Sequence, residues 1–271
     1  MNKCCSIFFI QLCLASGAHA ESAVTAEMAR TAEHLIEQAQ KDNMAYELVQ
    51  SLTTEIGPRL AGTSAEARAR NWAINKLELL GFENVHVESF EVPVWRRGRE
   101  QARIVSPFPQ PLRITALGGS TSTDENGVEG EVVGFPSLDS LIEADPARVE
   151  GKIVFVDEVM ARKRDGSGYG VAVQKRLRTA YVAQQLGAIA ALIRSVGTSS
   201  HRFPHTGQMR PLSDSAGKRG VPMAALSAPD ADQLSRVLSY GGPVVVHLLV
   251  TPEVRAPAQS GNVIAEIRGR D

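Results

Sequence analysis

Apolar residues recur along this chain with two different periods, and these periods predict its elements. Between Ala65 and Leu80 they return every three or four positions, which is typical of an amphipathic helix. Thr63 precedes this stretch and Glu66 follows three residues later, so the pair predicts an N-terminal capping box. Gly81 is placed to end the helix, because glycine adopts the left-handed conformation at little cost. We therefore expect one capped helix here.

A strand is expected after this helix, at residues 85–94. Its alternation of apolar and polar residues slips near Ser89, which predicts either a bulge there or a strand buried on both faces. Two amphipathic helices are expected before it, at residues 25–39 and 42–56. None of these elements can bury its apolar face alone, so we expect them to belong to a larger α/β domain.

A strand–helix–strand unit is expected further along, and its two strands should be parallel. Its predicted parts are a strand at 152–156, a helix at 174–186 and a strand at 188–193. The run GSGYG before the helix predicts a flexible loop. Short strands are also expected at 102–106, 112–117, 129–135, 221–226, 244–250 and 263–267, with a proline-containing linker at 251–260.

The first twenty residues have the pattern of a secretory signal peptide. Lys3 supplies the positive charge, residues 7–14 are apolar, and residues 18–20 read Ala-His-Ala, a small-x-small cleavage site. We expect cleavage after residue 20 and export to the periplasm or the medium. All three cysteines lie in this segment, so the mature chain is expected to have no disulfide and no thiol chemistry.

Charge and hydropathy exclude some partners. The formal net charge is −1, which gives no indication of binding to nucleic acid or to an anionic membrane. No second hydrophobic span follows the signal segment. Three arginines close together, Arg96, Arg97 and Arg99, are expected to lie in a solvated turn.

The candidate functional residues lie in a long loop predicted at residues 195–221. Its sequence includes His201, His205 and Arg210, and loops of this length are usually functional or mobile. Three roles stay open for the histidines: a surface role, contact with a substrate, or metal binding. Pro204 argues against the helix that i, i+4 zinc ligands would need. A loop with histidine and arginine suits a substrate carboxylate, so these three residues are our candidate substrate-binding residues.

Several segments together carry a family resemblance. They are IGPRLAGTSAE, GFENVHVESFEVPVW, GKIVFVD, RTAYVAQQLGAIAALIRS, SSHRFPHTGQMR, VPMAALSAPDADQL and SGNVIAEIRGRD. In order and spacing the chain resembles the co-catalytic zinc exopeptidases of the carboxypeptidase Q and bacterial aminopeptidase type. The resemblance implies an α/β fold: the N-terminal part of a peptidase domain at 21–99, an inserted α/β protease-associated domain at 100–253, and the return to the peptidase domain at 254–271, incomplete in this chain.

The resemblance also implies a chemistry. In this family two zinc ions activate a bridging water that attacks a peptide bond, with a glutamate as base. The family's ligands begin at a His-x-Asp motif after the strand that matches residues 262–267 here. We therefore expect this chain to lack the metal-binding half and to be inactive alone, and no catalytic or metal residue is assigned. The expected full-length activity is removal of residues from short peptides, as an aminopeptidase or a carboxypeptidase, and a homodimer is compatible with it.

An alternative function belongs to a different class. In this alternative the chain is a non-catalytic module, in which the protease-associated domain binds a peptide or a protein through the loop at 195–221.

Overall fold

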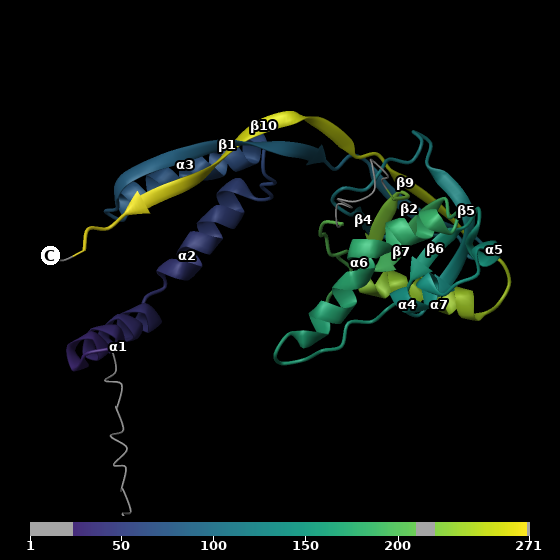
Figure 1. Ribbon diagram of the computed structural model, residues 1–271, viewed down its shortest axis with the longest axis horizontal. Helices are drawn as coiled ribbons and strands as arrows, with labels where there is room; N and C mark the ends of the chain where they lie inside the picture. The colour runs from purple at the N-terminus through teal and green to yellow at the C-terminus, as the bar shows by residue number, and fades with distance from the viewer. Residues whose placement is uncertain (1–23, 210–219, 270–271) are drawn as a thin grey trace, which may run out of the picture. The chain divides into compact units, whose positions relative to one another are not determined.

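The computed structural model describes residues 24–209 and 220–269 (Figure 1). The chain divides into two compact units, residues 1–59 and 60–271. The predicted signal peptide lies outside the described residues. All named strands of the described residues belong to the second unit.

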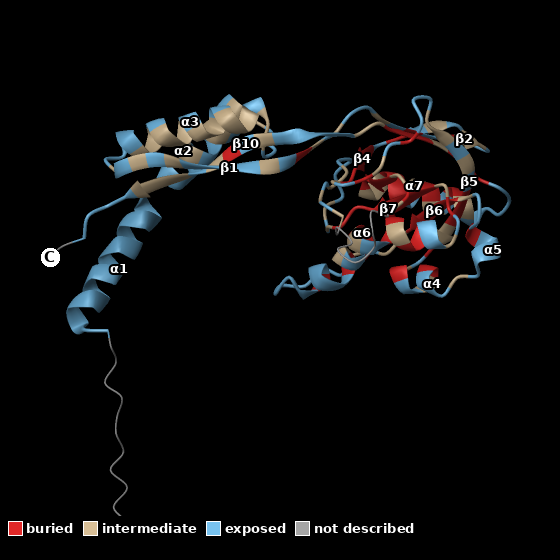
Figure 2. Ribbon diagram, turned by 45° about the horizontal axis from the view of Figure 1, so that its top comes forward, coloured by how far each residue is buried: buried red, intermediate tan, exposed pale blue. Residues whose placement is uncertain are grey.

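The described part of the first unit is helical. Its elements are α1 (Ala26–Lys41), α2 (Met44–Ser51) and a π-helical continuation, η1 (Leu52–Ile56). The Thr25 hydroxyl caps α1 by accepting from the Met28 amide at 3.1 Å. Asp42 Oδ1 accepts from the Met44 amide at 2.6 Å, but the N-cap position of α2 is Asn43, whose side chain makes no capping bond. The apolar stripe of α1 is not buried, since Leu35 is 62% exposed. Figure 2 colours the helix pale blue, as exposed.

In the second unit, α3 (Ser64–Leu79) is the helix predicted from the apolar spacing. The Thr63 hydroxyl accepts from the Glu66 amide at 3.3 Å, and Gly81 has φ of +83°, so both predicted ends are confirmed. The Glu66 carboxylate, predicted to turn back to the cap, instead accepts hydrogen bonds from Arg70 and Ser260. It therefore ties α3 to the strand that carries Ser260.

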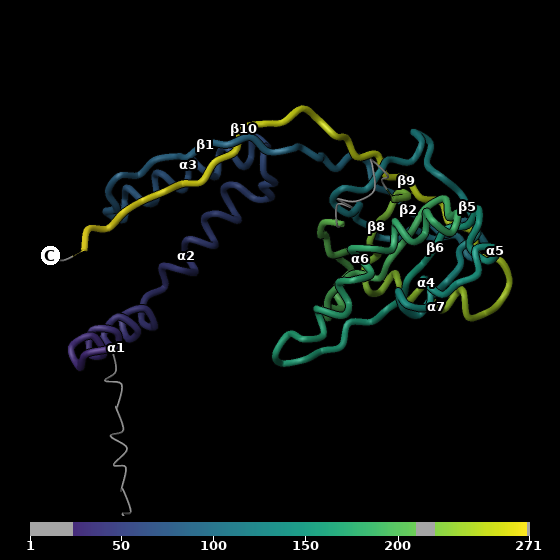
Figure 3. Tube along the Cα trace, viewed as in Figure 1, coloured from purple at the N-terminus to yellow at the C-terminus, as the bar shows by residue number. Residues whose placement is uncertain are grey.

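That strand, β10 (Glu253–Glu266), pairs with β1 (Glu83–Arg96) as an antiparallel two-stranded ribbon, which Figure 3 shows as two adjacent traces from opposite ends of the sequence. The predicted linker at 251–260 is wrong, because most of it is part of β10. Pro257 lies where the register shifts, between the Arg255–Val94 and Ala258–Val92 pairs. A proline has no amide proton to donate, so a strand accommodates it at such an irregularity.

The bulge predicted near Ser89 is also wrong. Ser89 pairs regularly with Gly261, and the register shifts fall between Glu83 and His86 and near Val92. Burial on both faces fails as well, because Phe90 is 42% exposed. The slip in the alternation therefore comes from an apolar residue that is partly exposed to solvent.

The rest of the second unit is built on an eight-stranded sheet with the order β3-β2-β9-β5-β6-β7-β8-β4. The strands are β2 (Glu100–Ser106), β3 (Gln110–Leu112), β4 (Ile114–Ala116), β5 (Val128–Phe135), β6 (Ile153–Val156), β7 (Ala190–Arg194), β8 (Met223–Leu226) and β9 (Val245–Val250). The four strands from β5 to β8 are parallel to one another, and the remaining pairs are antiparallel. The predicted parallel strand–helix–strand unit is confirmed as β6, α6 and β7.

Helices cover both faces of this sheet. Figure 2 shows most of the buried residues, in red, in this region. They are α4 (Leu138–Ile142), α5 (Pro146–Val149), α6 (Ser167–Gln185) and α7 (Ala228–Ser239). Phe155 and Leu192 share one cluster with Leu234 of α7, whereas Val156 and Ile193 share another with Ala183 of α6. Successive strand residues point to opposite faces, so the parallel strands are buried on both sides, as their β-branched runs suggest.

The helix α6 begins earlier than the sequence predicts. Gly166 has φ of +74° and precedes the first helical residue, Ser167, so the predicted flexible loop GSGYG is mostly the first turn of the helix. A side chain at Gly168 would lie 2.0 Å from the Ala161 carbonyl oxygen. Glycine is therefore needed here because the loop that leaves β6 passes against the helix backbone.

Candidate substrate-binding loop

The loop after β7 carries the candidate residues, and its start is fixed by buried hydrogen bonds. The Ser195 hydroxyl donates to the Leu226 carbonyl at 2.6 Å and accepts from the His205 amide at 2.8 Å. Ser195 is buried at the carboxyl end of β7. In parallel sheets this edge is where ligands commonly bind. The described part of the loop is therefore anchored at the edge where a site would be expected.

His205 is held by its own loop. Its Nδ1 lies 2.9 Å from the Val196 carbonyl oxygen, and because a carbonyl oxygen only accepts, Nδ1 is the donor of this bond. Gly197 packs against the ring, because an added Cβ there would lie 2.3 Å from Nδ1. The half-buried imidazole therefore stabilises the loop by a hydrogen bond from one ring nitrogen to the loop's own backbone.

His201 and Arg210 are not brought into this arrangement by the described structure. His201 is exposed, and its backbone amide donates to Ser199 Oγ at 3.2 Å. Arg210 lies outside the described residues. Within 24–209 and 220–269, no three His, Cys, Asp or Glu side chains converge to hold a metal ion.

Arg202 lies between the two histidines and anchors the loop to α7. Its Nη2 is 2.6 Å from Asp230 Oδ1, and Nε lies 3.0–3.1 Å from both carboxylate oxygens. The hydrogen bonds and the charge of Asp230 raise the pKa of the Arg202 guanidinium. Asp230 is only 3% exposed and also contacts the Ser227 cap. No local sequence pattern relates Asp230 to an arginine 28 positions away.

Two further arginines reach the loop at one residue, Thr206. Arg97 Nη2 donates to Thr206 Oγ1 at 2.7 Å, and Arg176 Nη1 donates to the Thr206 carbonyl at 3.2 Å. Arg97 also pairs with Glu100 at 3.0 Å and is only partly exposed, so the predicted solvated position is wrong for Arg97, whereas Arg96 and Arg99 are exposed as predicted. Burial raises the pKa of Glu100, opposed by the Ala116 amide and by Arg97. Both arginines are missed in the sequence because nothing local pairs them with the loop.

A cluster of charged residues lies at the carboxyl ends of β6 and β7. Arg194 bridges Asp157 and Asp232, each at 2.6 Å. Lys175 of α6 is fully buried, and its Nζ donates to the Glu158 carbonyl at 2.8 Å. Burial lowers the pKa of Lys175 to about 8, against the attraction of the Glu158 charge. This cluster joins the strand ends to α6 and α7.

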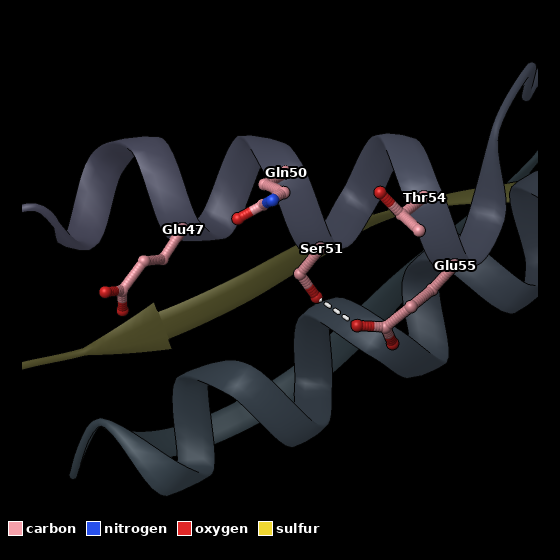
Figure 4. A pocket seen from close by; sticks show the side chains of 5 residues that line it. All are labelled: Glu47, Gln50, Ser51, Thr54 and Glu55. Atoms are coloured by element: carbon pink, nitrogen blue, oxygen red, sulfur yellow. Dashed lines mark hydrogen bonds between the residues drawn. The ribbon is translucent and has the colours of Figure 1, made fainter.

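An open depression in the first unit is formed by residues of α2 and η1 alone. It is lined by Glu47, Gln50, Ser51, Thr54 and Glu55, whose side chains Figure 4 shows. Ser51 Oγ donates to Glu55 at 2.5 Å. Its carboxylates, Glu47 and Glu55, are exposed, and its residues include no histidine. The depression therefore lacks the donor set of a zinc site.

Comparison with known proteins decides the family. A scan against protein-family models gives no match. Carboxypeptidase Q of Bos taurus is 34% identical over 243 residues, which cover 90% of this chain and 49% of that protein. The crystal structure of a peptidase M28 precursor from Shewanella amazonensis SB2B superposes with a TM-score of 0.83 at 44% identity, over 89% of this chain and 54% of that chain. This chain belongs to the M28 zinc exopeptidase family.

The M28 membership confirms the resemblance and the α/β fold predicted from the sequence. A zinc aminopeptidase from Bacillus subtilis shares the fold, with a TM-score of 0.56 at 22% identity, over 82% of this chain and 46% of that chain. The chain spans about half the length of the curated relatives it matches. Among the described helices, none is long and apolar enough to cross a membrane.

Proposed function

We propose that this M28 chain is the N-terminal portion of an exported, zinc-dependent exopeptidase that acts on short peptides. The observation that carries this proposal is the similarity to carboxypeptidase Q over 90% of the chain. In such an enzyme zinc supplies an activated water and polarises the peptide carbonyl. Amino- or carboxypeptidase specificity, and assembly as a homodimer, belong to the same proposal.

The described residues do not fit a pair of zinc ions, because no group of three ligand side chains converges in them. We therefore place the metal ligands and the general base in the part of the family's sequence that this chain does not match. The same proposal assigns residues 21–99 and 254–271 to the peptidase domain and residues 100–253 to an inserted protease-associated domain.

A hydrolysis assay tests this assignment. The 271-residue chain, supplied with zinc, is expected to give no release of amino acids from dipeptides above a protein-free control. A chain extended with the part of the Shewanella amazonensis peptidase that this chain does not match is expected to hydrolyse them. Turnover by the 271-residue chain would contradict the placement of the metal centre, and an inactive extended chain that folds would contradict the peptidase function.

Export is tested separately. The mature protein is expected to begin at Glu21 and to be recovered outside the cytoplasm, because residues 1–20 have the three parts of a signal peptide. The intact mass of the recovered protein decides this. A mass that still includes residues 1–20 would contradict the proposed cleavage.

A second candidate function, a non-catalytic peptide-binding module, is favoured by one observation. The loop that carries His205 is fixed by Ser195 and by Arg202, so it presents a defined surface without a metal. Binding of a peptide in the presence of chelator, with loss on His205→Ala or Arg210→Ala, is expected if this function applies. Unchanged binding in both variants would contradict the assignment to this loop.

A further inference from the structure

Arg176 is a buried cation without an acidic partner in the described residues. Only 9% of the residue is exposed. Its Nη2 donates to the Tyr169 hydroxyl at 2.7 Å, and its Nη1 donates to the Thr206 carbonyl at 3.2 Å. Its Nε is buried and has no hydrogen-bond partner. A guanidinium has five N–H donors, so this one keeps unused donors, and one of them, on Nε, is out of contact with water.

The neighbouring buried cations differ in this respect. Arg194 has the carboxylates of Asp157 and Asp232 at 2.6 Å. Lys175 lies near the Glu158 carboxylate, whose charge favours its protonated form. The Arg176 guanidinium has the Tyr169 ring at 5.6 Å but no anion among the described residues. Burying a charge without a counter-charge is costly, so this difference calls for a physical explanation.

Support of the loop is not a sufficient explanation, because the backbone already holds this part of it. The Gly118 amide donates to the Gly207 carbonyl at 2.8 Å, and the Met209 amide donates back to Gly118 at 2.9 Å. Arg97 holds the Thr206 side chain from the other direction. A neutral residue at position 176 would leave all of these bonds in place.

The residues that contact the Arg176 guanidinium lie at the surface of the protein. Gly207 passes directly over it, and a Cβ added there would lie 1.8 Å from Arg176 Nη1. Of the described residues that contact the guanidinium, Tyr169 is 45% exposed and Thr206 is exposed. The Tyr169 hydroxyl accepts from Arg176 and keeps its own proton to donate.

We infer that Arg176 and Tyr169 bind the α-carboxylate of a short peptide beneath the loop at Thr206 and Gly207. The planar guanidinium matches a carboxylate through two parallel hydrogen bonds, and the tyrosine hydroxyl adds a third donor. The anion also neutralises the buried charge. This inference rests on the proposed function for its ligand class, and it assigns to the chain a peptide-binding site that needs no metal.

The test is calorimetric titration of the 271-residue chain in the presence of chelator, with Ala-Ala, its C-terminal amide and inorganic phosphate as separate ligands. Ala-Ala is expected to bind, and the amide about tenfold more weakly or not at all, because it carries no negative charge. Equal binding of the amide would overturn the inference. Tighter binding of phosphate than of Ala-Ala would overturn the carboxylate assignment.

Arg176→Gln is expected to weaken Ala-Ala binding about tenfold or more, and Arg176→Lys less, because lysine keeps the charge but loses the planar fork. The matched control is Arg178→Gln, which removes an exposed arginine from the same helix and should bind like the wild type. Tyr169→Phe keeps the ring and removes one donor, so a several-fold loss is expected. If Arg176→Gln does not fold, Tyr169→Phe decides, and wild-type affinity in that variant would overturn the inference.

The inference and the proposed function fail separately. Carboxylate binding that depends on Arg176, together with an extended chain that hydrolyses no peptide, would retain the site and overturn the peptidase function. Hydrolysis by the extended chain, together with no carboxylate binding, would overturn the site alone.

Discussion

The eight-stranded sheet and the β1–β10 ribbon, two parts of one unit, bury their residues very differently. Every residue of β6, β7 and β8 is buried, whereas β1 and β10 contribute only Val94 and Ser260 to the buried set. The sheet has helices on both faces, and α3 is the helix that contacts the ribbon. A sheet covered on both faces buries its own hydrophobic core. The ribbon buries few residues and depends on strand pairing and on the packing of α3 against it.

The largest expected effect comes from removing the same side chain in each region. Phe155→Ala, in the core of the sheet, should lower the free energy of unfolding by about 3–5 kcal/mol, because Phe155 is fully buried. Phe90→Ala, in the ribbon, should cost about 1 kcal/mol or less, because Phe90 is 42% exposed. Urea denaturation followed by circular dichroism measures both variants.

Tryptophan fluorescence of a Trp95→Phe background follows the ribbon's helix in the same experiment. Of the chain's two tryptophans, Trp72 lies in α3, whereas Trp95 of β1 packs against the core of the sheet and donates to the Ser120 carbonyl at 3.1 Å, so only Trp72 reports on the ribbon side. Equal losses for the two phenylalanine variants would break the comparison, because they would show that the ribbon depends on a core as the sheet does.

A smaller effect, which depends on pH, is expected at Lys175. Its pKa is lowered from 10.5 to about 8, so between these pH values the unfolded chain holds a proton that the folded chain has released. The free energy of unfolding therefore rises with pH across this window, by about 2 kcal/mol after allowance for relaxation. The variant Lys175→Met should lack that rise.

The measurement is the difference between the wild-type and Lys175→Met unfolding free energies at pH 7.5 and at pH 10.5. Comparing the variants cancels the titration of groups they share. A difference that does not change with pH would show that the lysine is not desolvated, and the buried polar cluster of the sheet would then need another description.

The smallest effect, at Thr63, is expected in a comparison of two matched helix caps. Ser227 caps α7 against the sheet and is fully buried, whereas Thr63 caps α3 beside the ribbon and is partly exposed. Ser227→Ala should cost about 2 kcal/mol, because it also leaves the buried Asp230 with one partner fewer. Thr63→Ala should cost about 0.5–1 kcal/mol. The reverse order in thermal denaturation would contradict the stronger role assigned to the sheet.

Local chemistry made part of the fold predictable. The capping residue Thr63 and the αL glycine at position 81 determine the two ends of α3 through bonds within a few residues. The parallel strands were visible because burial on both faces requires continuous apolar runs. Pro257 misled the prediction, because a register shift between distant strands accommodates it.

The candidate site was less predictable because its contacts join distant positions. His205 was found through its loop, but Arg202, Arg97 and Arg176 gain their roles from partners many residues away. Arginine is common on surfaces, so its spacing alone does not indicate a buried role. Only the fold shows that Arg194 has two carboxylates and that Arg176 has none in the described residues.

The amount of bound zinc tests the central proposal most directly. The proposal is that this chain has part of the M28 exopeptidase fold but lacks its metal centre. The purified 271-residue chain is incubated with excess zinc, dialysed, and analysed for bound metal per chain. The account predicts no stoichiometric zinc, because the described residues assemble no ligand set. Two zinc ions retained per chain would contradict it.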